Sequence, residues 1–340
     1  MLTLRRGTVL SAGDPTAPMQ EVEVRLGGER RPALADTALV GPAHAGDEVV
    51  VNVAAVDLGL GSGGYDVVHV NLTRGLRGEG EVGAHVMKLN YTSLQHAVLP
   101  VEERQADAPP AAPEFPLKRP VAVIALHGQL APLAWAYRQA TNGEGRLGYV
   151  QTAGGALPGG HSCVVRELRA DGMLAGHLTA GPAFGGADGE AITTAAALHH
   201  GFTELRWDAA VAGPGPGILG SGSALGHGGL QALDSAHTAL ALGCRTLLVA
   251  RMSCTDARER HRGISHHTRT VLELLLAPVV VALPEQWSGP PPDGRHDCTA
   301  LPTDLDGYTA SGLPTRSMGR EDPLFFAAAL AAGTALAQST

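Results

Sequence analysis

The chain has 340 residues, which is enough for two domains of ordinary size. Hydrophobic residues make up 44% of the sequence, so substantial cores can form, and charged residues make up only 17%. The formal net charge of -8 argues against a nucleic-acid-binding protein, because such proteins normally carry a basic face.

The sequence favours neither a secreted nor a membrane protein. The four cysteines form no CxxC pair, which fits reduced thiols better than a disulfide framework or a zinc ribbon. No long apolar segment follows Arg5 and Arg6, as it would in a signal peptide. The longest apolar run, residues 271–283, contains Glu273 and Pro278 and is too short to cross a bilayer. We therefore expect a cytoplasmic protein.

Residues 1–103 show strand patterns throughout. The segment 20–26 alternates polar and apolar side chains, which is typical of a strand with one solvated face. Short strands separated by glycine and proline turns predict a small all-β barrel or sandwich. Residues 59–64 have the GxGxxG spacing, but a strand follows them instead of a helix, so a β-turn is a better interpretation than a dinucleotide site.

Residues 104–120 read as a linker between two domains. Its first residues are polar, and five prolines follow, which stiffen such a segment. They are Pro109, Pro110, Pro113, Pro116 and Pro120.

Strands and helices alternate over residues 121–340. The continuous apolar run 121–126 is typical of a strand buried on both faces. The repeated alternation predicts an α/β domain with a doubly wound, mainly parallel, Rossmann-like sheet. Within it we expect a helix over 188–200, a strand over 314–318 and a helix that begins at Asp322-Pro323.

Five predicted strands end in polar or glycine-rich turns. In a parallel sheet these turns share one edge, and ligands of open α/β sheets bind outside the carboxyl ends of the strands. The sequence therefore predicts a ligand cleft at this edge. The turns begin at His127, Thr152, Gly181, Gly213 and Arg251.

A second GxGxxG, formed by Gly215, Gly217 and Gly220, does follow a predicted strand. The helix does not begin at once, however, and the next strand ends at Arg251 instead of at an acid suited to a ribose hydroxyl. An arginine could instead bind a 2′-phosphate, so a nicotinamide-nucleotide site is one hypothesis for this segment. The other hypothesis is a loop that closes over a different ligand. No cofactor is assigned.

The turn 256–267 is rich in arginine and histidine. Guanidinium groups bind carboxylate or phosphate through two parallel hydrogen bonds, and the helix that begins at Ser265 adds backbone donors. Histidine carries protons near neutral pH. The alternative is a solvated loop whose arginines pair with its own acids. The ligand-binding candidates are Arg258, Arg260, Arg262 and His127, and the catalytic candidates are His261, His266 and Asp256.

A metal site is a third interpretation of the same turn. His261 and His266 would bind the ion, with His127 completing the set across the sheet edge and Asp256 offering an oxygen. The two histidines lack the i, i+4 spacing of a helical HExxH motif, so the spacing alone does not select this alternative.

Several strings along the chain together resemble an uncharacterised bacterial family, a domain of unknown function. The longest is the RERHRGISHHT string at residues 258–268, and the resemblance runs nearly end to end. It implies a shared fold and a cytoplasmic setting, but no reaction, ligand or catalytic residue. The other strings lie at 6–9, 58–65, 86–92, 213–215 and 318–320.

The leading hypothesis is an enzyme that acts on a small anionic metabolite, with phosphorylated compounds among the candidates. The arginines would hold this metabolite, and His261 or His266 would transfer protons. The alternative is a non-catalytic protein that uses the same pocket to bind a small ligand or to assemble. A homodimer is the default expectation for the oligomeric state, and no membrane or nucleic-acid partner is expected.

Overall fold

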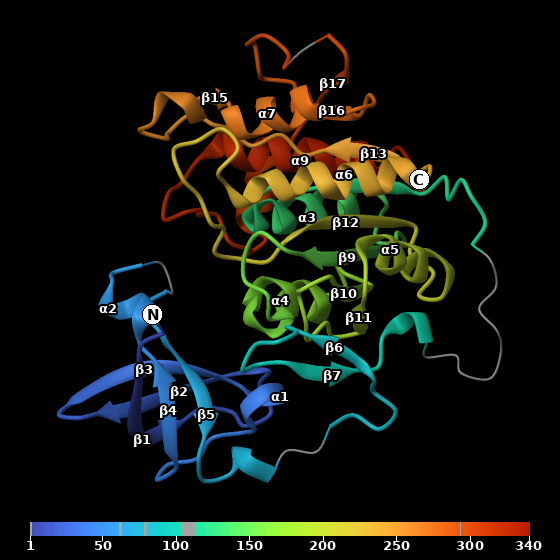
Figure 1. Ribbon diagram of the computed structural model, residues 1–340. Helices are drawn as coiled ribbons and strands as arrows, with labels where there is room; N and C mark the ends of the chain where they lie inside the picture. Colours follow the sequence, from blue (N-terminus) through green and yellow to red (C-terminus); the bar gives the residue numbers. More distant parts are fainter. Residues whose placement is uncertain (1, 61–62, 78–79, 104–112, 293) are drawn as a thin grey trace. The chain divides into compact units, whose positions relative to one another are not determined.

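The computed structural model describes residues 2–60, 63–77, 80–103, 113–292 and 294–340, and the chain divides into two units, Met1–Leu99 and Pro100–Thr340 (Figure 1). Residues 104–112 of the predicted linker, and Gly61 and Ser62 of the first glycine string, lie outside the described residues. The first unit ends before residue 103 because Val101 is buried in the core of the second unit, where Glu102 accepts a hydrogen bond from the Ile192 amide at 2.8 Å.

The first unit contains a closed barrel, which settles the expectation of a barrel or sandwich. Its spatial order among the described residues is β1-β2-β3-β5-β4, with β4 returning to β1. The alternation in β2 is confirmed, because Val22, Val24 and Leu26 all point into the barrel core. The strands are β1 (Leu4–Ala12), β2 (Met19–Leu26), β3 (Glu29–Asp36), β4 (Glu48–Asn52) and β5 (Asp66–Asn71), with α1 (Thr37–Val40), α2 (Ala54–Asp57) and the β6 (Val86–Lys88) and β7 (His96–Val98) hairpin beside them.

The second unit is built on an eight-stranded sheet, counted over its described residues, in which every pair of neighbouring strands is parallel. The predicted doubly wound, mainly parallel sheet is thereby confirmed. In spatial order the strands are β11 (Gly189–Ala191), β10 (Gly176–Ala180), β9 (Leu147–Thr152), β12 (Ala209–Pro214), β8 (Pro120–Val123), β13 (Arg245–Leu248), β16 (Val280–Pro284) and β17 (Asp297–Leu301).

Helices cover both faces of this sheet, and each face has its own hydrophobic core (Figure 1). None of the helices in the described ranges has the length and apolarity needed to cross a membrane. One face carries α3 (Leu130–Ala140), α4 (Cys163–Ala170), α8 (Leu305–Ala310) and α9 (Pro323–Ala337), and the other carries α5 (Thr194–Thr203), α6 (Gln231–Ala241) and α7 (His266–Leu274).

Two predicted elements are wrong. The segment 188–200 does not form one helix, because Asp188 accepts a hydrogen bond from the His177 amide at 2.8 Å and the chain then pairs with β10 as β11. Helix α5 begins only after Thr193, whose side chain caps it. The segment 314–318 forms no strand. Its end enters a turn over residues 317–320, in which Ser317 and Arg320 exchange backbone hydrogen bonds of 2.9 and 3.0 Å.

Some of the many glycines make room for one buried tryptophan. Trp207 is completely buried, and its ring lies against Gly148, Gly176 and Gly201. A Cβ at Gly148 would lie 2.0 Å from the ring, and one at Gly201 would lie 2.2 Å from it. Because interiors are packed to crystal-like density, no side chain fits at these positions without moving the ring.

We expect the variant Gly148→Ala to lower the free energy of unfolding of the second unit by about 1–3 kcal/mol, as overpacking typically does. Tryptophan fluorescence during urea unfolding measures this unit alone, because all three tryptophans, Trp135, Trp207 and Trp287, lie in it. The matched control is Gly222→Ala, where a Cβ meets nothing within 4 Å. Equal stability of the two variants would contradict the packing argument.

Candidate functional site

The candidate site lies at the carboxyl edge of the sheet, where β12 and β13 end on either side of β8. On one side of β8 the strands are β12, β9, β10 and β11, and on the other they are β13, β16 and β17, so successive connections run in opposite directions along the sheet from this point. Such a switch in strand order is the usual ligand position in open α/β sheets. After β13 the chain passes Arg251 and forms a loop that closes at its base. In this loop β14 (Met252–Ser253) pairs with β15 (Gly263–Ile264), and the Ser265 amide donates a hydrogen bond to the Arg251 carbonyl at 2.9 Å.

The glycine-rich loop after β12 returns to the same place. The Ser221 amide donates to the Gly226 carbonyl at 2.8 Å and the Gly228 amide donates to the Leu219 carbonyl at 2.7 Å, so the loop closes on itself. These bonds bring His227 back to the sheet edge. Its ring stacks on that of His267, with centroids 3.5 Å apart and planes 10° apart. The glycine-proline segment and the basic turn therefore meet.

Four imidazoles form what we call the histidine cluster: His227, His261, His266 and His267. Ring centroids are 4.8 Å apart for His261 and His266, 4.9 Å for His261 and His267, and 4.4 Å for His266 and His267. The Nδ1 atom of His261 is 2.8 Å from the Ser265 hydroxyl, which also caps α7. One side-chain nitrogen of each of His261, His266 and His267 lies within 4.8 Å of the others.

The histidine cluster is uncharged near neutral pH. Burial, with the nearby positive charge of Arg251, lowers the pKa of His261 to about 4. Burial and the neighbouring imidazole of His227 lower the pKa of His267 to about 2. Burial also lowers the pKa values of His227 and His266. Neutral imidazoles can accept protons or bind metal ions.

Beside the cluster, one carboxylate holds several guanidinium groups. Asp256 is fully buried and accepts hydrogen bonds from Arg258 at 3.0 and 2.9 Å and from Arg320 at 2.9 Å. A third guanidinium, that of Arg251, lies 3.7 Å away. The bonds from Arg258 hold the pKa of Asp256 well below its usual range. Three positive charges therefore face one negative charge.

Arg251 joins this carboxylate to the histidine cluster. Its Nη1 atom lies 2.8 Å from Nδ1 of His267, and its Nη2 atom lies 3.7 Å from Sδ of Met318. Burial lowers its pKa to about 10, so the group stays charged at neutral pH. Its Nε atom is buried and has no hydrogen-bond partner among the described residues, and the same holds for Nε of Arg320.

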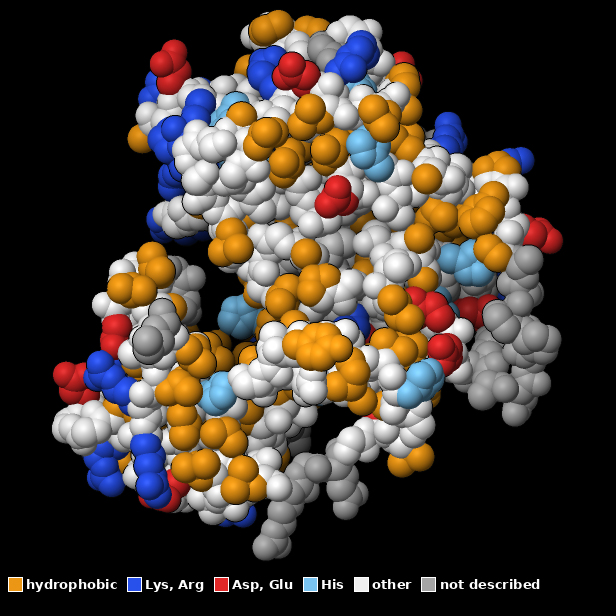
Figure 2. Space-filling view, viewed as in Figure 1, with side chains coloured by type: hydrophobic (Ala, Val, Ile, Leu, Met, Phe, Trp, Pro, Cys, Tyr) orange, Lys and Arg blue, Asp and Glu red, His pale blue; other side chains and the backbone are white. Residues whose placement is uncertain are grey.

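The structure brings together some of the predicted residues. His261 and His266 lie in the cluster, and Asp256 lies beside it as an ionised anchor for arginines instead of as a group poised to exchange protons. Arg258 is engaged by Asp256, and Arg262 donates through Nε to the Asp256 backbone carbonyl at 3.0 Å. Arg260 is exposed. Figure 2 shows basic side chains gathered on the edge of the unit that carries β15 in Figure 1.

His127 lies in a different set of contacts. Its Nδ1 atom faces the Pro214 carbonyl at 3.2 Å, and its Nε2 atom lies 2.7 Å from the Ser162 hydroxyl. Both ring nitrogens therefore have partners, and His127 does not complete the histidine set. Of the predicted glycines, Gly215 packs against the Ala156 carbonyl, whereas Gly217 and Gly220 have no neighbour within 4 Å of an added Cβ. Since α6 begins only at residue 231, these glycines do not lead directly into a helix N-terminus that could bind a nucleotide phosphate.

Four residues of the site had no assigned role in the sequence-based prediction of this site. His227 is the last residue of the glycine-rich loop, and nothing local distinguishes it. Arg251 comes shortly after the end of β13, which is a usable signal, but the sequence indicates for it only a contact with a nucleotide 2′-phosphate. His267 and Arg320 belong to strings that carry the family resemblance, which points to residues but not to their contacts.

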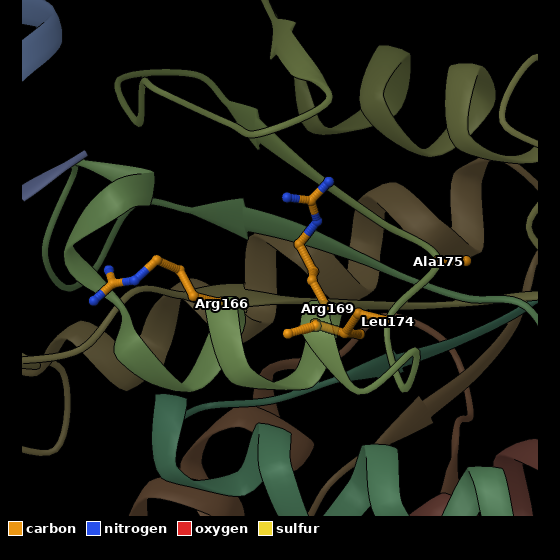
Figure 3. Close-up of a pocket in the computed structure, with 5 residues that line it drawn as sticks. Arg166, Arg169, Leu174 and Ala175 are labelled. Carbon is orange, nitrogen blue, oxygen red and sulfur yellow. The ribbon is translucent and has the colours of Figure 1, made fainter. Parts of the chain in front are cut away.

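Two surface cavities lie away from this site. One of about 500 Å³ is lined by Arg166 and Arg169 of α4, whose guanidinium groups point in different directions (Figure 3). Arg169 pairs with Asp188 at 3.0 Å, and Arg166 contacts the sulfur of Cys163 at 3.1 Å. The other, about 460 Å³, is lined by α3, α9 and residues 302–304. Neither cavity contains a group that our interpretation assigns to catalysis or ligand binding.

The variant Asp256→Asn removes the charge that holds the arginines. We expect it to lower the free energy of unfolding at pH 7 by about 3 kcal/mol, the low end for a broken buried ion pair, because two of the three arginines are partly exposed. Urea unfolding of the second unit measures the loss. The control Asp234→Asn changes an exposed carboxylate and should have no comparable effect.

The pH dependence of this difference has a defined sign. A carboxylate whose folded pKa lies below its unfolded value of about 3.9 stabilises the protein above that pH, and the stabilisation is lost as the pH falls through the folded pKa. The advantage of the wild-type chain over Asp256→Asn should stay constant from about pH 7 to pH 5 and shrink below about pH 4. Loss of the advantage between pH 7 and pH 5 would contradict an anchoring role.

Comparison with known proteins identifies a family for this chain. The family model described as "Protein of unknown function (DUF3866)" covers residues 32–333. Neither the curated proteins nor the solved structures contain a match to this chain. The resemblance found in the sequence strings is thereby confirmed at the level of an uncharacterised family. Since the model covers most of both units, the chain belongs to the DUF3866 family of proteins of unknown function.

Proposed function

We propose that the carboxyl-edge site binds a small anionic molecule, with a phosphate or carboxylate group, and that the protein is an enzyme acting on it. The observation that carries this proposal is the buried Arg251 side chain, whose Nε atom has no partner among the described residues. Buried polar groups in folded proteins nearly always find partners, and the exceptions often mark functional positions.

The local charge supports an anion specifically. Arg251, Arg258 and Arg320 together carry three positive charges, and Asp256 compensates only one of them. The Nε atoms of Arg251 and Arg320 are both left without partners beside that carboxylate. A phosphate or carboxylate group could accept from both, since guanidinium donors match the geometry of these anions. The Arg320 side chain is about a third exposed, which gives a ligand a route of approach.

The imidazoles beside the arginines support an enzyme over a protein that only binds. Anion binding by itself needs donors and positive charge, which the arginines supply. The histidine cluster adds neutral rings, and Nε2 of His266 has no hydrogen-bond partner among the described residues. The His266 residue is only partly buried, whereas this nitrogen is itself buried, so a molecule would meet it only from within the site. A ring nitrogen without a partner can exchange a proton with a ligand held next to it.

The wider setting is part of the proposal. The four cysteines are free thiols in the structure, which supports a reducing, cytoplasmic compartment. The bacterial origin rests on the resemblance alone. The net charge of -8 supports a partner other than nucleic acid. A homodimer remains the default proposal for the assembly.

The proposal predicts that inorganic phosphate binds to metal-free protein and that the variant Arg320→Gln weakens this binding at least tenfold. That factor corresponds to one lost charged hydrogen bond, about 1.5–3 kcal/mol. Isothermal titration calorimetry at constant ionic strength measures the affinity. The control Arg316→Gln removes an exposed arginine of the same loop, 65% exposed and 3.9 Å from Glu321, and should change the affinity less than twofold.

Two results would overturn the proposal. One is the absence of phosphate binding to the wild-type chain. The other is an equal loss in Arg320→Gln and Arg316→Gln, which would show that phosphate responds only to the general positive charge of the loop.

A further inference from the structure

We propose that His261, His266 and His267 form a binding site for a divalent first-row transition-metal ion, with zinc as the occupant. The inference deepens the proposed function, on which it rests for the role of the ion: the metal would lie beside the arginines that bind the anion. The ligand set itself stands on its own geometry.

The first support is the convergence of three imidazole nitrogens within 4.8 Å of one another. A tetrahedral zinc ion with bonds of 2.0–2.1 Å to nitrogen needs its ligand atoms about 3.4 Å apart. The ligand nitrogens that are farthest apart would therefore have to approach one another by up to about 1.4 Å. His261 and His267 are buried, whereas His266 is partly exposed and leaves an approach for the ion.

The second support is the state of the other ring nitrogens. His261 contacts the Ser265 hydroxyl through Nδ1, and that hydroxyl can accept a hydrogen bond from an Nδ1–H group, which leaves Nε2 for an ion. Metal-binding histidines usually fix their second nitrogen in this way. His266 has a buried Nε2 atom with no partner among the described residues.

His267 adds a condition to metal binding. Arginine only donates hydrogen bonds, so the 2.8 Å contact from Arg251 makes Nδ1 of His267 an acceptor and places the ring proton on Nε2. When an ion takes the Nε2 lone pair, that proton moves to Nδ1 and the Arg251 contact must break. An anion would then offer the released Nη1 atom, and the already free Nε atom, a new partner. Metal and anion should therefore occupy adjacent places without competing.

Three protein imidazoles leave a fourth coordination position open. In catalytic zinc sites this position holds water or a substrate oxygen. The ring of His227 stacks on that of His267, with centroids 3.5 Å apart, but His227 does not belong to the three converging histidines. It therefore covers the ring of His267 and does not bind the ion. The chemical class of ligand for the site is therefore an oxygen-bearing anion next to a three-histidine ion.

The test uses the chain of residues 1–340, stripped of metal and free of phosphate, and Co²⁺ as a spectroscopic probe for zinc. We expect one equivalent of Co²⁺ to bind and give the visible absorption of a four- or five-coordinate ion, and zinc to displace it. Loss of an outer contact of a metal site typically costs 10–100-fold in affinity, so loss of a ligand in His266→Gln should cost at least about 100-fold.

Two matched variants make the result specific. His44→Gln changes an exposed histidine of the barrel, and His227→Gln removes the stacked ring but none of the three ligands; both should keep the Co²⁺ absorption. Unfolding followed by tryptophan fluorescence verifies that the second unit, which carries the three ligands, is folded in each variant. No stoichiometric Co²⁺ binding by the wild-type chain, absorption that survives in folded His266→Gln, or absorption that is lost in folded His227→Gln would each overturn the assignment.

This test separates the two proposals. Metal-free protein that binds phosphate while the chain fails to bind Co²⁺ leaves the proposed function standing and removes the metal site. Co²⁺ binding that depends on His266, in a chain that does not bind phosphate, supports the metal site and removes the anion-binding function.

Discussion

The buried carboxylate of Asp256 is the contact on which the candidate site depends. It lies among Arg251, Arg258 and Arg320, which come from the end of a strand, from the basic turn and from a loop far along the chain. Without a negative charge at this point, three guanidinium groups would repel one another, which would destabilise the turn. With it, the turn folds back through the β14–β15 pair and holds its histidines beside the sheet edge.

The contact leaves an imbalance that points to function. One carboxylate does not neutralise three arginines, and buried donors on Arg251 and Arg320 have no partners among the described residues. Next to them lie imidazoles that burial keeps neutral. Natural sequences satisfy most local requirements and depart from them mainly at functional sites. Excess charge and unpaired donors concentrated at the switch point of a parallel sheet are such a departure.

The sequence predicts the parts of this protein whose signal is local. Residues 22–26 show their burial pattern as an alternation of polar and apolar side chains, and residues 121–123 show theirs as a continuous apolar run. These two patterns predict a β-domain and a parallel sheet. The site depends on contacts that periodicity does not encode. His227 reaches His267 only because backbone bonds close a glycine-rich loop, and Arg320 meets Asp256 from 64 residues away. His127 was predicted to join the cluster, but Ser162 and Pro214 occupy its nitrogens.

The central claim is that the ends of β12 and β13 form one ligand site around the unpaired donors of Arg251 and Arg320. Anomalous X-ray diffraction from crystals soaked in selenate, a tetrahedral dianion shaped like phosphate, tests it most directly. The account predicts a selenium peak about 4 Å from the Nε atoms of both arginines, the separation that charge-assisted hydrogen bonds impose. Peaks confined to exposed arginines elsewhere, or no peak at this edge of the sheet, would contradict it.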